Sequence, residues 1–153
     1  MFHKILIPLD GSSASEGALA YLDHLRTEQI LLARVYGQTS EAESVGQQEC
    51  MEYLKGLRAR LASMLDIQLA CVPGEPAEAI LRLAESAGCD LILMTSHGGR
   101  GTSSCFLGSI AENVTRHAIC PVLLVGRQAV APAPDSAAQA ALARAQELVE
   151  GCL

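Results

Sequence analysis

Short apolar runs alternate with longer stretches of helical periodicity along most of this chain. The runs at residues 4–9, 30–36, 90–95 and 121–125 are mainly apolar, whereas residues 67–72 alternate partly between apolar and polar. Continuous apolar runs of this length are typical of strands covered on both faces, and partial alternation is typical of an edge strand. We therefore predict a strand at each of these five places.

The segments between these runs carry apolar residues at spacings of three and four, the pattern of a helix with one face on a sheet. A capping box of Ser13 and Glu16 predicts the start of the first helix, and Pro76 and Gly88 are placed to begin and end the third. Gly56 lies inside the second helix and costs roughly 1 kcal/mol against Ala. The second and fourth helices are expected over 43–64 and 108–118. The residues expected to face the sheet are, in the first helix, Ala14, Ala18, Tyr21 or Leu22, and Leu25. In the second helix they are Cys50, Leu54, Leu57, Leu61 and Met64, and in the third Ala77, Ile80, Leu81, Ala84 and Ala87.

This alternation of strand and helix predicts a parallel sheet with right-handed crossovers and helices on both faces. The expected fold is an α/β three-layer sandwich around a five-stranded parallel sheet. Residues 126–134 have the composition of a linker, and Asp135 or Ser136 would cap a last helix. We therefore expect one domain over 1–127, followed by a linker and C-terminal helix over 128–153.

Composition and charge exclude several classes of partner. A chain of 153 residues is most simply one domain, and its net charge of −6 offers no basic face for nucleic acid. No apolar run approaches the ~20 residues of a membrane span, and the opening residues 1–8 are too short for a signal peptide. We expect a cytoplasmic protein that binds neither nucleic acid nor membrane.

Six cysteines are scattered along the chain without a Cys-x-x-Cys pair. Cys71, Cys89 and Cys120 lie in or beside apolar runs, which favours buried reduced thiols. His117 lies three residues before Cys120, but no second pair of ligands accompanies it, so a zinc site is not expected.

The residues that leave the predicted strands should converge, because ligands of open parallel sheets bind outside the carboxyl ends of strands. Pro8-Leu9-Asp10, Val35-Tyr36 and Met94-Thr95-Ser96 stand at these ends, and Asp10 is the only carboxylate among them. It would accept hydrogen bonds from ribose hydroxyls or share a metal with phosphates. The alternative is that Asp10 caps the following turn, but Ser13 already offers a cap, so we favour ligand contact.

A loop rich in glycine follows the fourth strand and leads into the last helix of the sheet. Gly98, Gly99 and Gly101 permit close approach of the backbone to an anion, and Gly108-Ser109 adds the N-terminus of a helix. The string is neither a P-loop nor the dinucleotide-binding fingerprint. His97 would add charge or pack within the loop. We predict a phosphate cradle.

These motifs together resemble the nucleotide-binding branch of the universal stress protein family. The family motif is Gly-x-x-Gly, nine residues, then Gly-Ser/Thr, and it aligns with Thr95-Ser96-His97-Gly98, residues 99–107, and Gly108-Ser109. The resemblance covers residues 1 to about 127 and includes the segments 5–12, 31–35, 89–94 and 120–125.

The resemblance implies an adenine nucleotide alpha hydrolase-like, Rossmann-like fold and a site for ATP or AMP, often with Mg²⁺. It also implies a homodimer through strand 121–125, which would cover an exposed apolar edge; the alternative cover is the C-terminal helix. By resemblance, the adenosine is framed by Pro8, Leu9, Asp10, Val35 and Met94, and the phosphates are held by Thr95, Ser96, His97, Gly98, Gly108, Ser109 and Ile110.

The chain departs from the family at Thr95, where the motif has glycine. A threonine is unsuitable if this residue needs φ > 0, but it can stay extended and offer its hydroxyl. We expect an ATP- or AMP-binding stress-response regulatory protein that acts through nucleotide-dependent interactions. The alternative is an interaction protein of the same fold that has lost nucleotide binding.

Catalysis is not expected from these residues. No evident base stands beside a γ-phosphate, and the Lys and Mg²⁺ scaffold of phosphoryl-transfer enzymes is missing from the motifs. We predict a binder whose ATP hydrolysis is slow or absent. A flavin enzyme on a similar sheet is disfavoured, because Tyr36 is the only aromatic residue near the predicted site.

Overall fold

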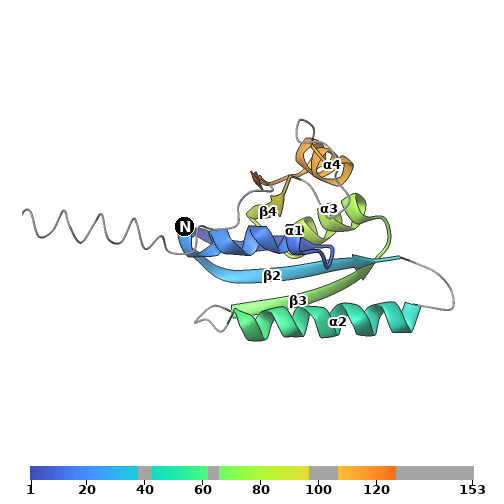
Figure 1. The fold of residues 1–153 in the computed structure, drawn as a ribbon. Helices are drawn as coiled ribbons and strands as arrows, with labels where there is room; N and C mark the ends of the chain where they lie inside the picture. The colour runs from blue at the N-terminus through green and yellow to red at the C-terminus, as the bar shows by residue number, and fades with distance from the viewer. Residues whose placement is uncertain (38–42, 62–65, 97–106, 127–153) are drawn as a thin grey trace, which may run out of the picture.

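The computed structural model describes residues 1–37, 43–61, 66–96 and 107–126, and the account below concerns these residues (Figure 1). Strand and helix alternate as predicted. The elements are β1 (Phe2–Leu9), α1 (Ser13–Glu16), the 3₁₀ helix η1 (Gly17–His24), β2 (Thr27–Tyr36), α2 (Glu43–Arg60), β3 (Asp66–Pro73), α3 (Pro76–Ser86), β4 (Leu91–Thr95), α4 (Ser109–His117) and β5 (Val122–Val125).

The five strands form one parallel sheet in the order β3-β2-β1-β4-β5. β3 and β5 are the two edges, as the sequence predicted. The strand order reverses between β1 and β4, where the chain crosses from one half of the sheet to the other. These two strands are in register only at Ile5 with Leu91 and Leu6 with Ile92, although β1 continues to Leu9. Ligands of parallel α/β sheets bind at such a reversal.

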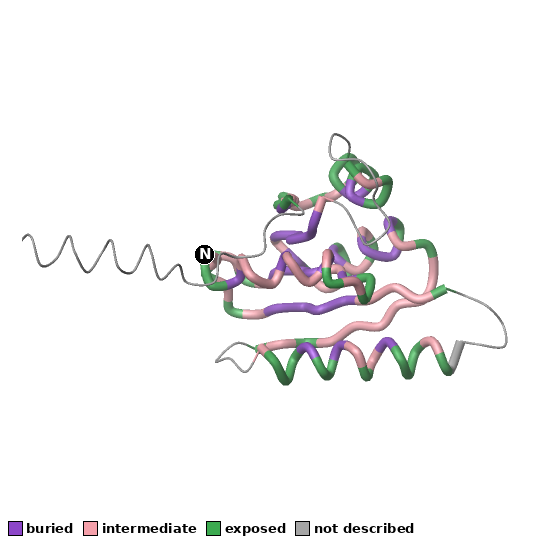
Figure 2. Tube along the Cα trace, viewed as in Figure 1, coloured by how far each residue is buried: buried purple, intermediate pink, exposed green. Residues whose placement is uncertain are grey.

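Side chains of the sheet alternate between two apolar cores, which makes the predicted three-layer sandwich. Ile5, Ile7 and Leu9 of β1 lie in the core under η1 and α2. Leu6 lies in the other core, under α3 and α4. Figure 1 shows α2 on one side of the sheet and α3 and α4 on the other, and Figure 2 shows the middle of β2 buried between them.

The capping box predicted at the first helix is wrong. The N-cap is Ser12, whose hydroxyl accepts a hydrogen bond from the Ser15 N–H at 3.2 Å. Glu16 does not reach back to cap the helix because its carboxylate binds Arg60 and Tyr53 of α2. The segment also changes from α-helix to 3₁₀ geometry at Gly17, a residue type that weakens helix interiors.

The second and third helices largely follow the predicted pattern. The stripe on α2 is buried at Cys50, Leu54 and Leu57, although the helix ends at Arg60 rather than Met64. Helix α3 begins at Pro76, and Gly88 follows it with φ +65°. Met64 and the predicted C-terminal helix over 128–153 lie outside the described residues.

The described helices include none that is both long and apolar enough to cross a membrane. The cysteines described here, Cys50, Cys71, Cys89 and Cys120, are free thiols. Of the three for which burial was predicted, Cys89 is buried and the other two are half-buried. Burial raises the pKa of the Cys89 thiol to about 11, which keeps it protonated at neutral pH.

Candidate functional site

Two backbone hydrogen bonds join the end of β4 to the start of α4 and to the end of β5. The Gly108 N–H donates to the Ser96 carbonyl at 2.9 Å, and the Ser96 N–H donates to the Val125 carbonyl at 2.9 Å. The two halves of the predicted phosphate motif are therefore adjacent. The residues between them, including His97 and Gly98, lie outside the described part of the chain.

The N-terminus of α4 presents backbone donors next to Ser96. Gly108 is the N-cap, and no side chain caps the helix. The first bond within the helix is donated by Glu112 to the Gly108 carbonyl, so the N–H groups of Ser109 and Ile110 have no partner inside the helix. Ser109 and Ile110 are exposed. This end of the helix carries partial positive charge, and an anion placed there is stabilised.

The N–H of Gly108 is not one of these donors, because the Ser96 carbonyl already accepts it. Gly108 also has φ −62° and ψ 148°, a conformation open to any residue. Glycine is therefore not needed here for its backbone freedom. What it provides is the absence of a side chain beside the donors of Ser109 and Ile110.

Thr95 occupies the last position of β4 in an extended conformation. It is in register with Val125 of β5 and is only 7% exposed. No non-glycine residue in the described ranges has positive φ, so this place in the motif does not demand glycine on conformational grounds. The extended conformation considered for Thr95 is confirmed, and the role of its hydroxyl toward a ligand stays a prediction.

Asp10 lies in the turn that leaves β1, and its carboxylate organises that turn. Oδ1 accepts hydrogen bonds from the Ser12 N–H at 2.8 Å and from the Ser12 hydroxyl. Gly11 between them has φ +88°, which favours glycine. The reason for preferring ligand contact, that Ser13 supplied the cap, is wrong because Ser12 supplies it with Asp10 as partner. The side chain is nevertheless exposed at the carboxyl end of β1.

The residues predicted to frame an adenosine are not all on one face of the sheet. Leu9 is buried in the core beneath η1 and α2. Met94 is buried in the opposite core, and Val35 packs against that same core. Pro8, the residue before Leu9 on β1, is half-buried. The structure therefore brings Asp10, Ser96 and Ser109 to the carboxyl edge but points Leu9 away from Val35 and Met94.

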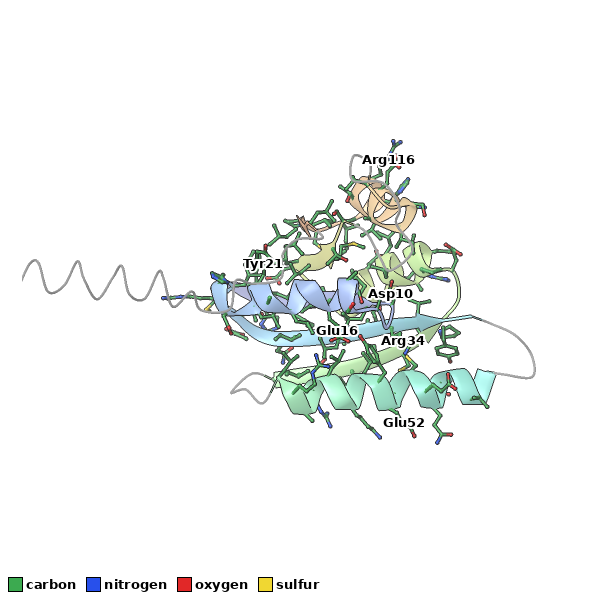
Figure 3. The ribbon with its side chains drawn as sticks, viewed as in Figure 1. Asp10, Glu16, Tyr21, Arg34, Glu52 and Arg116 are labelled. Carbon is green, nitrogen blue, oxygen red and sulfur yellow. The ribbon has the colours of Figure 1, made fainter. Side chains whose placement is uncertain are left out.

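Arg34 is the residue at this edge that the sequence motifs missed. It is in register with Leu9 of β1 and with Cys71 of β3. Its guanidinium lies 5.0 Å from the centre of the Tyr53 ring and against Gly11, where an added Cβ would be 3.1 Å from a guanidinium nitrogen. Figure 3 shows Arg34 and Asp10 near the same end of β2. The available signal was a charged residue near the end of an otherwise apolar strand.

A polar cluster of Glu16, Tyr53 and Arg60 joins α1 to α2 next to Arg34. The Tyr53 hydroxyl donates to Glu16 Oε1 at 3.0 Å, and Arg60 pairs with Glu16 Oε2 at 2.7 Å. Burial and the hydrogen bond to Glu16 raise the pKa of Tyr53 above its usual value, so Tyr53 stays neutral and acts as a donor. The cluster fixes the ring on which Arg34 stacks.

The described residues contain no group of three or more His, Cys, Asp or Glu side chains arranged to hold a metal ion. The edge of the sheet instead combines backbone donors at α4, one carboxylate at β1 and one guanidinium at β2. In the class of open parallel α/β proteins, small ligands, often phosphorylated ones, commonly bind at the carboxyl edge where the strand order reverses, and these groups lie at that edge.

Comparison with known proteins narrows this class to one family. Residues 1–126 match the model of the universal stress protein family. The chain therefore belongs to that family. The resemblance to the family is confirmed, and so is the expected α/β fold around a five-stranded parallel sheet.

Relatives and solved structures agree with the assignment. A universal stress protein of Thermus aquaticus is 34% identical over 136 residues, which cover 82% of this chain and 99% of that one. The solved structure of protein MJ0577, a universal stress protein of Methanocaldococcus jannaschii, has a TM-score of 0.75 at 30% identity, with 84% of this chain and 98% of that one covered.

Two further solved members of the family share the fold at lower identity. A universal stress protein in complex with cAMP has a TM-score of 0.61 at 24% identity and covers 81% of this chain and 97% of its own. A family protein from Arabidopsis thaliana with AMP bound has a TM-score of 0.60 at 17% identity and covers 88% and 98%.

Proposed function

We propose that this protein binds an adenine nucleotide, ATP or AMP, at the carboxyl edge of β1 and β4. In this proposal, occupancy of the site regulates which proteins it contacts during stress. The observation that carries the proposal is the hydrogen bond from Gly108 to Ser96, which places the uncapped start of α4 beside the end of β4.

Backbone donors at the start of α4 and a carboxylate in the turn after β1 support this ligand. The N–H groups of Ser109 and Ile110 are suited to phosphate oxygens, and the Ser109 hydroxyl adds a further donor. Asp10, in the turn after the neighbouring strand β1, is suited to accept hydrogen bonds from ribose hydroxyls. Mg²⁺ would enter bound to the phosphates of ATP.

Two solved members of the family contain such ligands, one cAMP and the other AMP. They support an adenine nucleotide as the ligand class. They do not separate ATP from AMP, which differ only in phosphates that would extend past α4.

Thr95 favours the alternative function, an interaction protein of the same fold without a nucleotide. Its side chain is buried at the end of β4, where the family motif has glycine. Micromolar affinity needs about −8 kcal/mol, whereas a helix N-terminus contributes only about 0.3–1 kcal/mol. Most of the affinity must therefore come from the nucleoside and from several hydrogen bonds together.

Thermal unfolding with and without ATP and Mg²⁺ tests the proposal. A ligand at one hundred times its Kd stabilises by about 2.7 kcal/mol, which for a domain of this size raises Tm by roughly 5–10 °C. Gly108→Val should abolish most of this shift, because its side chain crowds the donors of Ser109 and Ile110 without straining the backbone. Asp10→Asn should reduce the shift while keeping an acceptor for Ser12.

Gly56→Ala is the matched control, since Gly56 lies on α2 with nothing within 4 Å of an added Cβ. It should leave the ATP-induced shift unchanged. Mass spectrometry of the purified protein provides a second readout by detecting nucleotide carried through purification. No shift at millimolar ATP and Mg²⁺, together with no copurified nucleotide, would establish the interaction protein instead.

We further infer a homodimer through β5. Within the described part of the chain, β5 is an edge strand that pairs only with β4, and Leu123 on it is 37% exposed. Exposed apolar edges are templates for pairing with another strand, so a second copy of β5 would cover it.

A further inference from the structure

Two free cysteines from different elements meet between the sheet and α2. Cys71 of β3 is in register with Arg34 of β2, and the Cys50 thiol of α2 donates a weak hydrogen bond to the Arg34 carbonyl at 3.6 Å. The two cysteines therefore lie at the same level of the sheet. Cys71 also packs against the core that contains Cys50, and their side chains contact each other through a hydrogen bond.

The two thiols differ in exposure, which sets the order in which an oxidant reaches them. Cys50 is only 1% exposed, whereas Cys71 is half-buried on β3, which in the described part of the chain is an edge strand paired only with β2. Burial and the contact with Cys71 raise the pKa of the Cys50 thiol to about 12, which keeps it protonated at neutral pH. Cys71 is therefore the first point of attack, and Cys50 is the thiol behind it.

We infer that Cys50 and Cys71 form a reversible disulfide when the protein meets a hydroperoxide. The Cys71 thiolate attacks one peroxide oxygen, the O–O bond breaks and hydroxide leaves, so that Cys71 becomes a sulfenic acid. The Cys50 sulfur then attacks the Cys71 sulfur. The S–S bond forms, the S–O bond breaks, and the Cys50 proton leaves with the hydroxide as water. In total, two thiols lose two electrons and one hydrogen peroxide becomes two waters.

The second step is intramolecular, because the two side chains are already in contact. Such proximity raises the effective concentration of the attacking group and offsets the small fraction of Cys50 that is ionised. The product ties α2 to the edge strand β3 and closes a loop over residues 50–71. Both cysteines lie on the face of the sheet opposite α4, so this inference is independent of the proposed nucleotide site.

Peptide mapping of the full-length protein tests the pairing. Trypsin places Cys50 in the peptide 35–55 and Cys71 in the peptide 61–82, each without another cysteine. After treatment with hydrogen peroxide and alkylation of the remaining thiols, we expect these peptides to be joined, lighter by two hydrogens, and separated again by dithiothreitol. Because the cross-link restricts the unfolded chain, the Tm should rise by roughly 5–12 °C and return on reduction.

Variants separate the roles of the two thiols. Cys71→Ser should prevent both the joined peptides and the rise in Tm. Cys50→Ala should leave the Cys71 sulfenic acid without a partner, so dimedone should label Cys71 in this variant and not in wild type. Cys120→Ser is the matched control, since Cys120 is also a half-buried free thiol but packs against the opposite core, and it should behave like wild type. Equal Tm values of the reduced variants verify that each is folded.

Several results would overturn the inference. Cys71 could proceed to sulfinic or sulfonic acid without joined peptides, pair with a different cysteine, or join Cys50 of a second chain, which a non-reducing gel would show. Failure of hydrogen peroxide to modify either thiol would overturn it as well. None of these results bears on nucleotide binding, because the ATP-induced shift in Tm is measured separately under reducing conditions.

Discussion

At the scale of single residues, Asp90 shows how one side chain fastens the two central strands. Its carboxylate accepts hydrogen bonds from the backbone N–H groups of His3 at 2.8 Å and Lys4 at 2.9 Å, at the start of β1. Its own N–H donates to the Lys4 carbonyl at 3.0 Å. Desolvation acts to raise the pKa of Asp90, but the backbone hydrogen bonds outweigh it and the pKa is lowered.

We predict that Asp90→Asn lowers stability by about 1 kcal/mol at neutral pH. An amide oxygen accepts less strongly than a carboxylate oxygen, and the NH₂ group of the asparagine would face a backbone N–H of His3 or Lys4, to which it cannot hydrogen-bond. A lowered pKa in the folded state means that the charged form stabilises the fold. This contribution is fully present above the unfolded pKa of about 3.9 and is lost as pH falls through the folded pKa. Urea denaturation at several pH values checks this.

The difference between wild type and Asp90→Asn should therefore be constant above about pH 5 and shrink below pH 4. Asp23→Asn is a suitable control, since Asp23 is exposed on η1 with no salt bridge among the described residues. A difference that persists unchanged at low pH would contradict the prediction.

Single residues also show where sequence reasoning stops. Asp10 was predicted at the carboxyl edge because it directly follows an apolar run, and Ser109 because it lies at the start of a helix. That Asp10 binds Ser12 was considered and set aside, because the cap was assigned to the wrong serine. Arg34 was not considered, because a motif cannot state which face of a strand a residue occupies.

At the scale of elements, the helices depend on glycines whose backbone requirements differ. Gly88 follows α3 with φ +65°, whereas Gly56 lies inside α2 and has no positive φ. An added Cβ at either residue would meet nothing within 4 Å. Substitution by alanine at either site therefore changes stability only through the conformational preference of the backbone.

We predict opposite effects of the same substitution at these two glycines. Gly56→Ala should stabilise by about 1 kcal/mol, because alanine is a better helix former. Gly88→Ala should destabilise by about 1 kcal/mol, because left-handed backbone is strained for any residue with a Cβ. Thermal unfolding should show Tm shifts of roughly 3–5 °C in opposite directions. Shifts of the same sign would contradict this account.

Element boundaries were predicted best where a proline or a glycine marks the end of a helix. Pro76 and Gly88 begin and end α3 for the reasons that the sequence offered. The segment after Ser12 was predicted as one helix, but it splits into α1 and η1. Apolar spacing fits both helix types over so short a length, and the partners of Glu16 on α2 are invisible to local pattern.

At the scale of the whole molecule, the two edges of the sheet differ in how they are covered. β3 packs against α2. On β5, Leu123 is 37% exposed, and Ile119 just before the strand is 70% exposed. The apolar surface left on this side supports the proposed homodimer.

We predict that Leu123→Lys converts the dimer to a monomer, because a charge on the edge would have to be buried in the pair. Size-exclusion chromatography with light scattering checks this. Val45→Lys is the control: Val45 is 54% exposed on α2, at the opposite side of the sheet, and its substitution should leave the dimer intact. A monomeric wild type, or a Leu123→Lys variant that remains dimeric, would refute the interface.

The sequence by itself determined the order of elements, the parallel sheet and the family, because apolar periodicity and motif spacing are local properties of the chain. Only the tertiary structure decided that the Gly108 N–H is used by Ser96 and that Leu9 points away from Val35. It also brought Arg34 to Gly11 across two strands. These features depend on which side of a strand each residue faces and on which partner reaches it first, and both are settled only when distant segments pack together.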